Sequence, residues 1–93
     1  MGISRTDAEE KVLRTFVVNG QLTRLPARWK KRMVILRWLV DQLDPDRRYP
    51  EQEINDFLRR FYSDVATIRR EFIVYRLMDR EGGVYWRIDT PAD

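Results

Sequence analysis

Basic and hydroxyl side chains on one face of a predicted helix are the residues of this 93-residue chain best suited to recognise another molecule. A helix is expected from Asp64 to about Arg76, and at about 100° per residue Ser63, Thr67 and Arg70 lie opposite its apolar stripe. Arg70 could donate two hydrogen bonds to guanine O6 and N7 in a DNA major groove, and Thr67 could contact a phosphate or a thymine methyl group. Ser63, the expected N-cap, could bind a phosphate together with the free amides of the helix start. The alternative is a solvated face on which Arg70 pairs with Glu71 or with a more distant carboxylate.

A second group of basic residues lies in the amino-terminal half. From Arg24 to Arg37 there are six basic residues and no acid, and four of them are candidates for contacts with DNA phosphates: Arg28, Lys30, Lys31 and Arg32. Each neutralised phosphate steepens the salt dependence of binding by about 0.9 in the log–log slope. The same side chains could instead be solvated or bind an acidic patch on a partner protein.

The last two candidates for DNA contact, Arg80 and Arg87, lie on a hairpin predicted from Leu77 to Ile88. Its tip is Glu81-Gly82-Gly83, where the glycines allow the positive φ angles of a tight turn. A wing that enters the minor groove usually carries an uncompensated basic residue at its tip, and this tip carries none. A hairpin that closes the core is therefore favoured over one that contacts DNA.

The composition argues against catalysis. The chain has no cysteine and no histidine, which excludes disulfides, Cys/His zinc sites and Cys-His or Ser-His nucleophiles. Nothing in the sequence indicates two carboxylates held across a cleft with separated pKa values. We therefore expect no enzyme activity, no metal and no cofactor. The sequence shows neither an apolar run long enough to span a bilayer nor the apolar region of a signal peptide, so a cytoplasmic location is expected.

Two helices are predicted in the amino-terminal half. Thr6-Asp7-Ala8-Glu9 has the pattern of a capping box and predicts a helix from Asp7 to Val18, with Asn19-Gly20 as its left-handed stop. Gln21 to Leu25 is expected to be a short strand or an extended link. Pro26 then predicts the start of a second helix that runs to Leu43.

The carboxyl-terminal half has a more diagnostic order of elements. Tyr49 is expected in a minor strand, followed by a helix from Glu51 to about Phe61 and a turn at Tyr62-Ser63. The helix of Arg70 and the hairpin come next. This order predicts an α+β, mostly helical fold, a winged helix-turn-helix with an extra N-terminal helix and a C-terminal β-hairpin. We expect a single winged-helix-like domain over residues 1–93, with an N-terminal helical extension at 1–25, the winged-helix core at 26–88 and a flexible tail at 89–93.

Three tryptophans are assigned to packing: Trp29, Trp38 and Trp86. Trp38 is the exception to watch, because it lies off the main apolar stripe of its helix and beside Val34. An exposed Trp38–Val34 pair would indicate a contact with a second copy of the chain or with another regulatory protein, or else a lid over the first helix.

Arg69 lies beside the apolar stripe of its helix rather than opposite it. We therefore expect its stem to pack on the core and its guanidinium group to pair with an acid such as Asp79 or Glu53.

Several segments in order resemble a small bacterial family known only as a domain of unknown function. They are Leu25-Pro26 with the basic residues after it, Tyr49 to Asn55, Asp64 to Glu71, and Asp79 to Arg87. The chain departs from the family's pattern at Pro50, where a Thr or Ser cap is usual. The family also occurs behind helix-turn-helix domains similar to those of ArsR-type repressors. The resemblance therefore implies gene regulation, either by direct DNA contact or as a dimerising or sensing unit.

Together these features predict a transcriptional regulator that binds duplex DNA through the helix at 64–76. We expect it to form a dimer, since winged-helix regulators are commonly two-fold dimers that contact paired half-sites. The alternative is a winged-helix protein-interaction or dimerisation module that does not itself bind DNA. RNA binding is less favoured, because no platform of exposed aromatic residues is evident.

Overall fold

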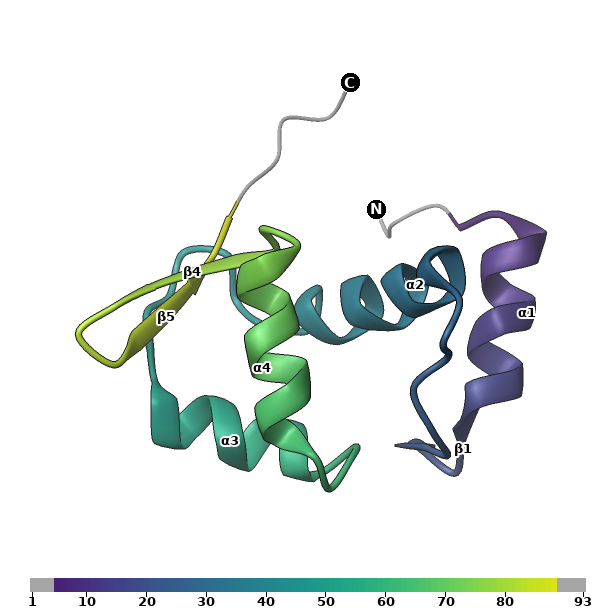
Figure 1. Ribbon diagram of the computed structural model, residues 1–93, viewed down its shortest axis with the longest axis horizontal. Helices are drawn as coiled ribbons and strands as arrows, with labels where there is room; N and C mark the ends of the chain where they lie inside the picture. Colours follow the sequence, from purple (N-terminus) through teal and green to yellow (C-terminus); the bar gives the residue numbers. More distant parts are fainter. Residues whose placement is uncertain (1–4, 89–93) are drawn as a thin grey trace.

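A computed structural model describes residues 5–88 of the chain. The elements in this part, shown in Figure 1, are α1 Asp7–Phe16, β1 Val17–Val18, β2 Gln21–Leu22, α2 Trp29–Val40, β3 Tyr49–Pro50, α3 Glu51–Arg59, α4 Val65–Val74, β4 Met78–Glu81 and β5 Val84–Arg87. α1 lies at one end of the molecule beside α2, and the β4–β5 hairpin extends from the opposite end (Figure 1). The flexible tail predicted at residues 89–93 lies outside the described residues.

α1 begins as the sequence predicts but ends earlier. In the capping box the Thr6 amide donates to Glu9 Oε1 at 2.9 Å, and the Glu9 amide donates to Thr6 Oγ1 at 3.1 Å. The helix ends at Phe16 rather than Val18, because Val17 and Val18 pair with Leu22 and Gln21 in a small hairpin. Asn19 and Gly20 have φ angles of 53° and 77°, so the predicted left-handed pair is confirmed but forms the hairpin turn instead of a helix stop.

α2 is shorter at both ends than the sequence predicts. It begins at Trp29, three residues after Pro26, because Arg28 is extended with φ −70° and ψ 131°. It ends at Val40, before Leu43. Three of its residues, Ile35, Leu36 and Leu39, are fully buried. α2 is therefore the central core helix, and Leu13 and Phe16 of α1 join the same core.

A three-stranded antiparallel sheet with the order β3-β5-β4 follows. The strand predicted at Tyr49 is confirmed, since Tyr49 pairs with Tyr85 of β5. Tyr85 also faces Arg80 of β4, and its own side chain is fully buried. Four helices and two small antiparallel sheets make up the described residues, so the predicted α+β class is confirmed, and the arrangement is consistent with a winged helix-turn-helix.

α3 begins without a side-chain cap. Pro50 occupies the N-cap position and offers no hydrogen-bonding side chain, so the Glu51 amide donates instead to the Gly83 carbonyl oxygen at 2.9 Å. Gly82 and Gly83 have φ angles of 59° and 78°, which confirms the predicted glycine turn at the hairpin tip. The turn thus satisfies the first free amide of α3, whereas a Ser or Thr at position 50 would accept from the amide two or three residues further on.

α4 ends at Val74, two residues earlier than predicted. The Leu77 amide donates to the Phe72 carbonyl at 2.8 Å, and the Arg76 amide donates to the Ile73 carbonyl at 3.2 Å. This pair of bonds is the Schellman motif. Arg76 has a φ of 58°, a left-handed conformation in which glycine is usual. The motif turns the chain sharply from α4 into β4.

Candidate nucleic-acid interface

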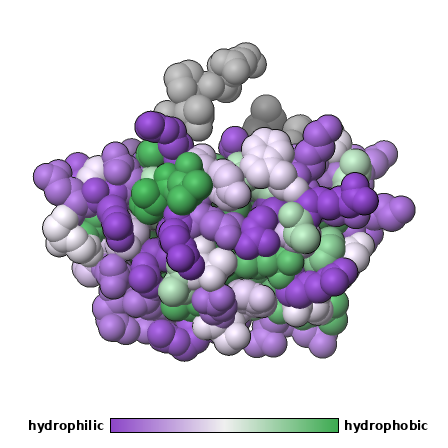
Figure 2. All heavy atoms as spheres, viewed as in Figure 1, coloured by the Kyte–Doolittle hydropathy of each residue, from purple (hydrophilic) through white to green (hydrophobic). Residues whose placement is uncertain are grey.

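The outward side of α4 remains uncovered in the described structure. Ala66 and Arg70 are exposed, and Val74 is 63% exposed. Ile68 and Phe72, on the opposite side of the helix, are fully buried. Figure 2 shows the face that α4 crosses in Figure 1, and hydrophilic side chains cover most of it. The predicted division of α4 into a core face and a free face is therefore confirmed.

A hollow of about 470 Å³ lies between this free face and the β4–β5 hairpin. Its lining includes three arginines from two elements, Arg69 and Arg70 of α4 and Arg80 of β4. Ala66, Ile73, Val74 and Tyr85 complete the lining. The hollow therefore joins a positively charged rim to small and apolar walls.

Arg69 is held at the edge of the hollow by α3. Its Nη1 donates to Asn55 Oδ1 at 2.5 Å, and its Nε lies 3.8 Å from Glu51 Oε1. The expectation that Arg69 pairs with an acid is confirmed, but the acid is Glu51 rather than Asp79 or Glu53. Helical spacing placed Arg69 on a flank and could not tell which residue of another helix would face it.

Arg80 reaches the hollow from the hairpin side. Its Nη1 donates to the Tyr85 hydroxyl at 3.3 Å, and that hydroxyl donates to Glu51 Oε1 at 3.0 Å. The hydrogen bond with Tyr85 raises the pKa of Arg80. The side chain is exposed, so its charge remains accessible to a ligand.

The start of α4 differs from the prediction. Asp64, not Ser63, is the N-cap, and its carboxylate accepts from the Thr67 amide at 3.2 Å and from the Thr67 hydroxyl at 2.7 Å. The hydrogen bond from the Thr67 hydroxyl, followed by that from the amide, lowers the pKa of Asp64. A carboxylate therefore already occupies the helix start where a phosphate was expected. The Thr67 hydroxyl has donated its proton to Asp64, so only its oxygen, as an acceptor, and its methyl group are left for a base.

Two predicted DNA contacts are instead tied to the protein. Arg32 donates from Nε and Nη2 to the two carboxylate oxygens of Glu71, both at 2.6 Å, and from Nη1 to the Pro26 carbonyl at 3.0 Å. The hydrogen bond to Glu71 raises the pKa of Arg32. The alternative in which Glu71 pairs with Arg70 is therefore wrong.

Arg87 is also engaged, which agrees with a hairpin that closes the core. Its Nη1 donates to the Leu43 carbonyl at 2.7 Å, and its Nη2 lies 3.5 Å from Asp41 Oδ1. Arg87 thus ties β5 to the end of α2, and of the two hairpin arginines only Arg80 faces the hollow.

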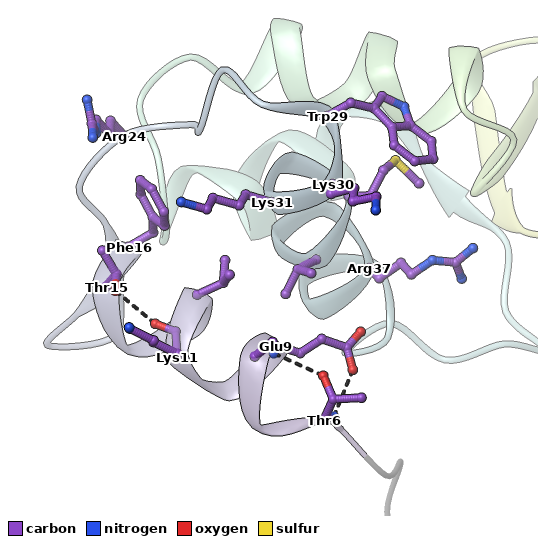
Figure 3. Close-up of a pocket in the computed structure, with 14 residues that line it drawn as sticks. Thr6, Glu9, Lys11, Thr15, Phe16, Arg24, Trp29, Lys30, Lys31 and Arg37 are labelled. Carbon is purple, nitrogen blue, oxygen red and sulfur yellow. Dashed lines mark hydrogen bonds between the residues drawn. The ribbon is translucent and has the colours of Figure 1, made fainter.

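The basic cluster before and within α2 does not form one patch. Arg32 is paired as described, Arg28 is exposed at the N-cap of α2, and Lys30 and Lys31 line a groove between α1 and α2 (Figure 3). Consecutive residues of a helix point in different directions, which explains the separation. The four basic residues that are close in the sequence therefore lie in three different surroundings on the surface.

The three tryptophans differ in how far they are buried. Trp29 is 59% exposed, so its assignment to the core is wrong. Trp38 is partly buried, with its ring 5.4 Å from that of Phe61 in an edge-to-face contact. Val34 lines the α1–α2 groove, so Trp38 and Val34 do not form the freely exposed pair considered from the sequence. Trp86 is partly buried beneath the guanidinium group of Arg48, at 4.2 Å from the ring centroid.

Within residues 5–88, no group of three or more Asp, Glu, His or Cys side chains is placed to hold a metal ion. No helix in that part of the chain is long and apolar enough to cross a membrane.

Residues 21–87 match the family described as "Uncharacterized protein conserved in bacteria (DUF2087)", and the chain belongs to this family. The matched segment includes β2, α2 and all of the elements from β3 to β5. No curated protein and no solved structure matches the chain. The resemblance to a bacterial family of unknown function, found from the motifs, is therefore confirmed.

Proposed function

We propose that this domain is a cytoplasmic bacterial transcription regulator that binds duplex DNA, with α4 in the major groove and the β4–β5 hairpin against the adjoining backbone. The observation that carries the proposal is the convergence of Arg69, Arg70 and Arg80 on the hollow beside the exposed face of α4. α4 has 10 residues and is therefore about 15 Å long. The diameter of an α-helix with its side chains, about 10–12 Å, fits a major groove about 12 Å wide and 8.5 Å deep.

The side chains on this face suit different parts of a duplex. Arg70 is the candidate for a two-bond contact with guanine, and Arg80 is the candidate for a phosphate contact from the hairpin. Ala66 and Val74 permit close approach and offer apolar contact to thymine methyl groups.

Two further points support a regulatory role. The chain belongs to an uncharacterised family conserved in bacteria. The motifs quoted from the sequence resemble a family of winged-helix type that also occurs behind ArsR-like helix-turn-helix domains, which implies gene regulation. A two-fold dimer would present two copies of α4 to half-sites about one helical turn apart, as winged-helix regulators commonly do.

The proposal is tested by fluorescence anisotropy of the purified protein with a random-sequence duplex over a salt series. Arg70→Met and Arg80→Met are compared with Arg59→Met, which removes the same charge from an exposed position on α3. Among residues 5–88, Arg59 has an ion pair with Asp56 alone. We expect salt-dependent binding, with the log–log slope reduced by about 0.9 for each phosphate contact that is lost. After selection of a preferred site, Arg70→Met should cost about 1–3 kcal/mol at one base position.

Absence of binding at low salt would refute the proposal. Equal losses in Arg59→Met and Arg70→Met would refute it as well, because binding would then follow net charge rather than the face of α4. Either result would favour the alternative, an interaction module of winged-helix type that does not contact DNA.

A further inference from the structure

A groove of about 800 Å³ lies along the junction of α1 and α2, and its lining does not include α4 or the hairpin (Figure 3). Its apolar lining comes from both helices: Ala8, Val12 and Phe16 on α1, and Trp29, Met33 and Val34 on α2. Most of the exposed area inside the groove is apolar. Such a groove between two helices has the form of sites that receive a third, amphipathic helix.

The rim of the groove is strongly basic. Five cations line it: Lys11, Arg24, Lys30, Lys31 and Arg37. Within residues 5–88, none of these five lies within 4.0 Å of a carboxylate oxygen. Glu9 is the one acid in the lining, and its carboxylate accepts from the Thr6 amide in the capping box. The rim therefore favours an anionic partner.

The cations are spread along the groove rather than gathered at one end. In Figure 3, Arg24, Lys31 and Lys11 lie toward one side of the view and Arg37 toward the other, with Lys30 between them. A single-headed amphiphile needs positive charge at one end only. A helix with carboxylates along both edges of an apolar stripe would meet the distributed charge and the apolar lining together.

A second copy of the chain is a poorer occupant. A two-fold contact through this surface would bring the same patch against itself, and so would oppose two sets of five cations. Like charges placed opposite each other across an interface are unfavourable.

We infer that the α1–α2 groove is a docking site for an acidic amphipathic helix of a partner protein. Trp29, which is 59% exposed at the start of α2, supplies an aromatic anchor of the type that dominates such interfaces. Lys30 and Lys31 are then rim contacts to carboxylates rather than to DNA phosphates. The inference does not depend on DNA binding, because no groove residue lies on α4 or the hairpin.

The test uses a synthetic helical peptide of about 16 residues, long enough to cover the groove, with a leucine stripe flanked by glutamates. A control peptide keeps the stripe and replaces the glutamates by lysines. Binding to the full chain is measured by titration calorimetry and by tryptophan emission, with Trp29→Phe used to isolate the signal of Trp29 from those of Trp38 and Trp86. The protein variant is Lys31→Glu/Arg37→Glu, and its matched control is Arg14→Glu/Arg59→Glu, which makes the same change in charge at exposed positions outside the groove.

We expect the acidic peptide to bind, to shift the Trp29 emission to the blue, and to lose about tenfold or more in affinity with Lys31→Glu/Arg37→Glu but not with the control variant. The inference is overturned if the lysine peptide binds equally well, or if neither peptide binds. It is also overturned if dodecanoate alone shifts the Trp29 emission, which would make the occupant a small amphiphile. Self-association of the protein that is lost in Trp29→Ala would make the occupant a second copy.

Discussion

Removing one partner of the Arg32–Glu71 ion pair should lower the free energy of unfolding, and the size of the loss can be estimated from the distances and burial of the pair. The pair joins α2 to α4 across 39 positions of the sequence, with both carboxylate oxygens at 2.6 Å from the guanidinium group. The side chains are only 20% and 17% exposed. Arg32→Met keeps the apolar stem and leaves the Glu71 carboxylate with neither of these hydrogen bonds.

The expected magnitude lies between two limits. Exposed ion pairs contribute about 0–1 kcal/mol. Loss of one partner of a fully buried pair costs about 3–5 kcal/mol, because the other charge stays buried and unpaired. At the exposures found here we expect Arg32→Met to lower the free energy of unfolding by about 2 kcal/mol. For a domain of this size that corresponds to a fall in Tm of roughly 10 °C.

Urea unfolding of a double-mutant cycle measures this directly. Arg32→Met/Glu71→Leu replaces the pair by apolar groups and should recover much of the loss, since such replacements are often nearly neutral. A loss below about 0.5 kcal/mol in Arg32→Met would mean that the pair behaves as an exposed one, and the reasoning would be refuted. At low temperature, where Arg32→Met remains folded, it should retain DNA affinity if Arg32 is a packing residue rather than a phosphate contact.

Three further outcomes are expected. Arg76→Gly should raise the free energy of unfolding by about 1 kcal/mol in thermal or urea unfolding, because the φ of 58° is strained for arginine, and a decrease would contradict this account. Gly83→Ala should lower it by about 1–2 kcal/mol from backbone strain alone, since a Cβ at this position would meet nothing within 4 Å; an unchanged urea midpoint would count against the turn. Asp64 has a folded-state pKa below its unfolded value because of Thr67, so its stabilising effect is full above the unfolded pKa, about 3.9, and is lost as pH falls through the folded pKa. The stability of the wild type relative to Asp64→Asn should therefore be constant from neutral pH to about 4 and fall below it, and a difference that does not change with acid would contradict the capping role.

Local signals in the sequence were sufficient for several elements. The capping box at Thr6, the glycine turn at the hairpin tip and the strand at Tyr49 are each specified by residues that are close in the chain. The two faces of α4 follow from helical spacing alone. These features depend on dihedral preferences and periodicity, which a sequence expresses directly.

Other features depend on partners that are distant in the chain. Arg32 and Glu71 are 39 positions apart, and neither segment of the sequence indicates that they pair. Arg32 was therefore predicted to contact DNA phosphates together with the basic residues beside it. Helical spacing likewise placed Trp29 with the core of α2, but α2 begins at that residue and the structure leaves most of its side chain uncovered. Which charged residues pair, and which side chains are covered by others, depends on the assembled fold rather than on the local sequence pattern.

Local patterns were also ambiguous where two residues could fill one role. Ser63 and Asp64 are both good N-caps, and hydrogen bonds from Thr67 show that Asp64 has the position. α4 ends at a left-handed Arg76, where the usual glycine signal is missing. Val17 and Val18 leave α1 because strand pairing with Leu22 and Gln21 suits β-branched residues.

The contact between the hairpin tip and the start of α3 has a mechanical consequence. The Gly83 carbonyl accepts from the Glu51 amide, and the Glu51 carboxylate accepts in turn from Tyr85 inside the same hairpin. Bending the hairpin away from the start of α3 would therefore break both of these hydrogen bonds. Two hydrogen bonds therefore tie the β4–β5 hairpin to the start of α3, and they help to fix the hollow between the hairpin and α4.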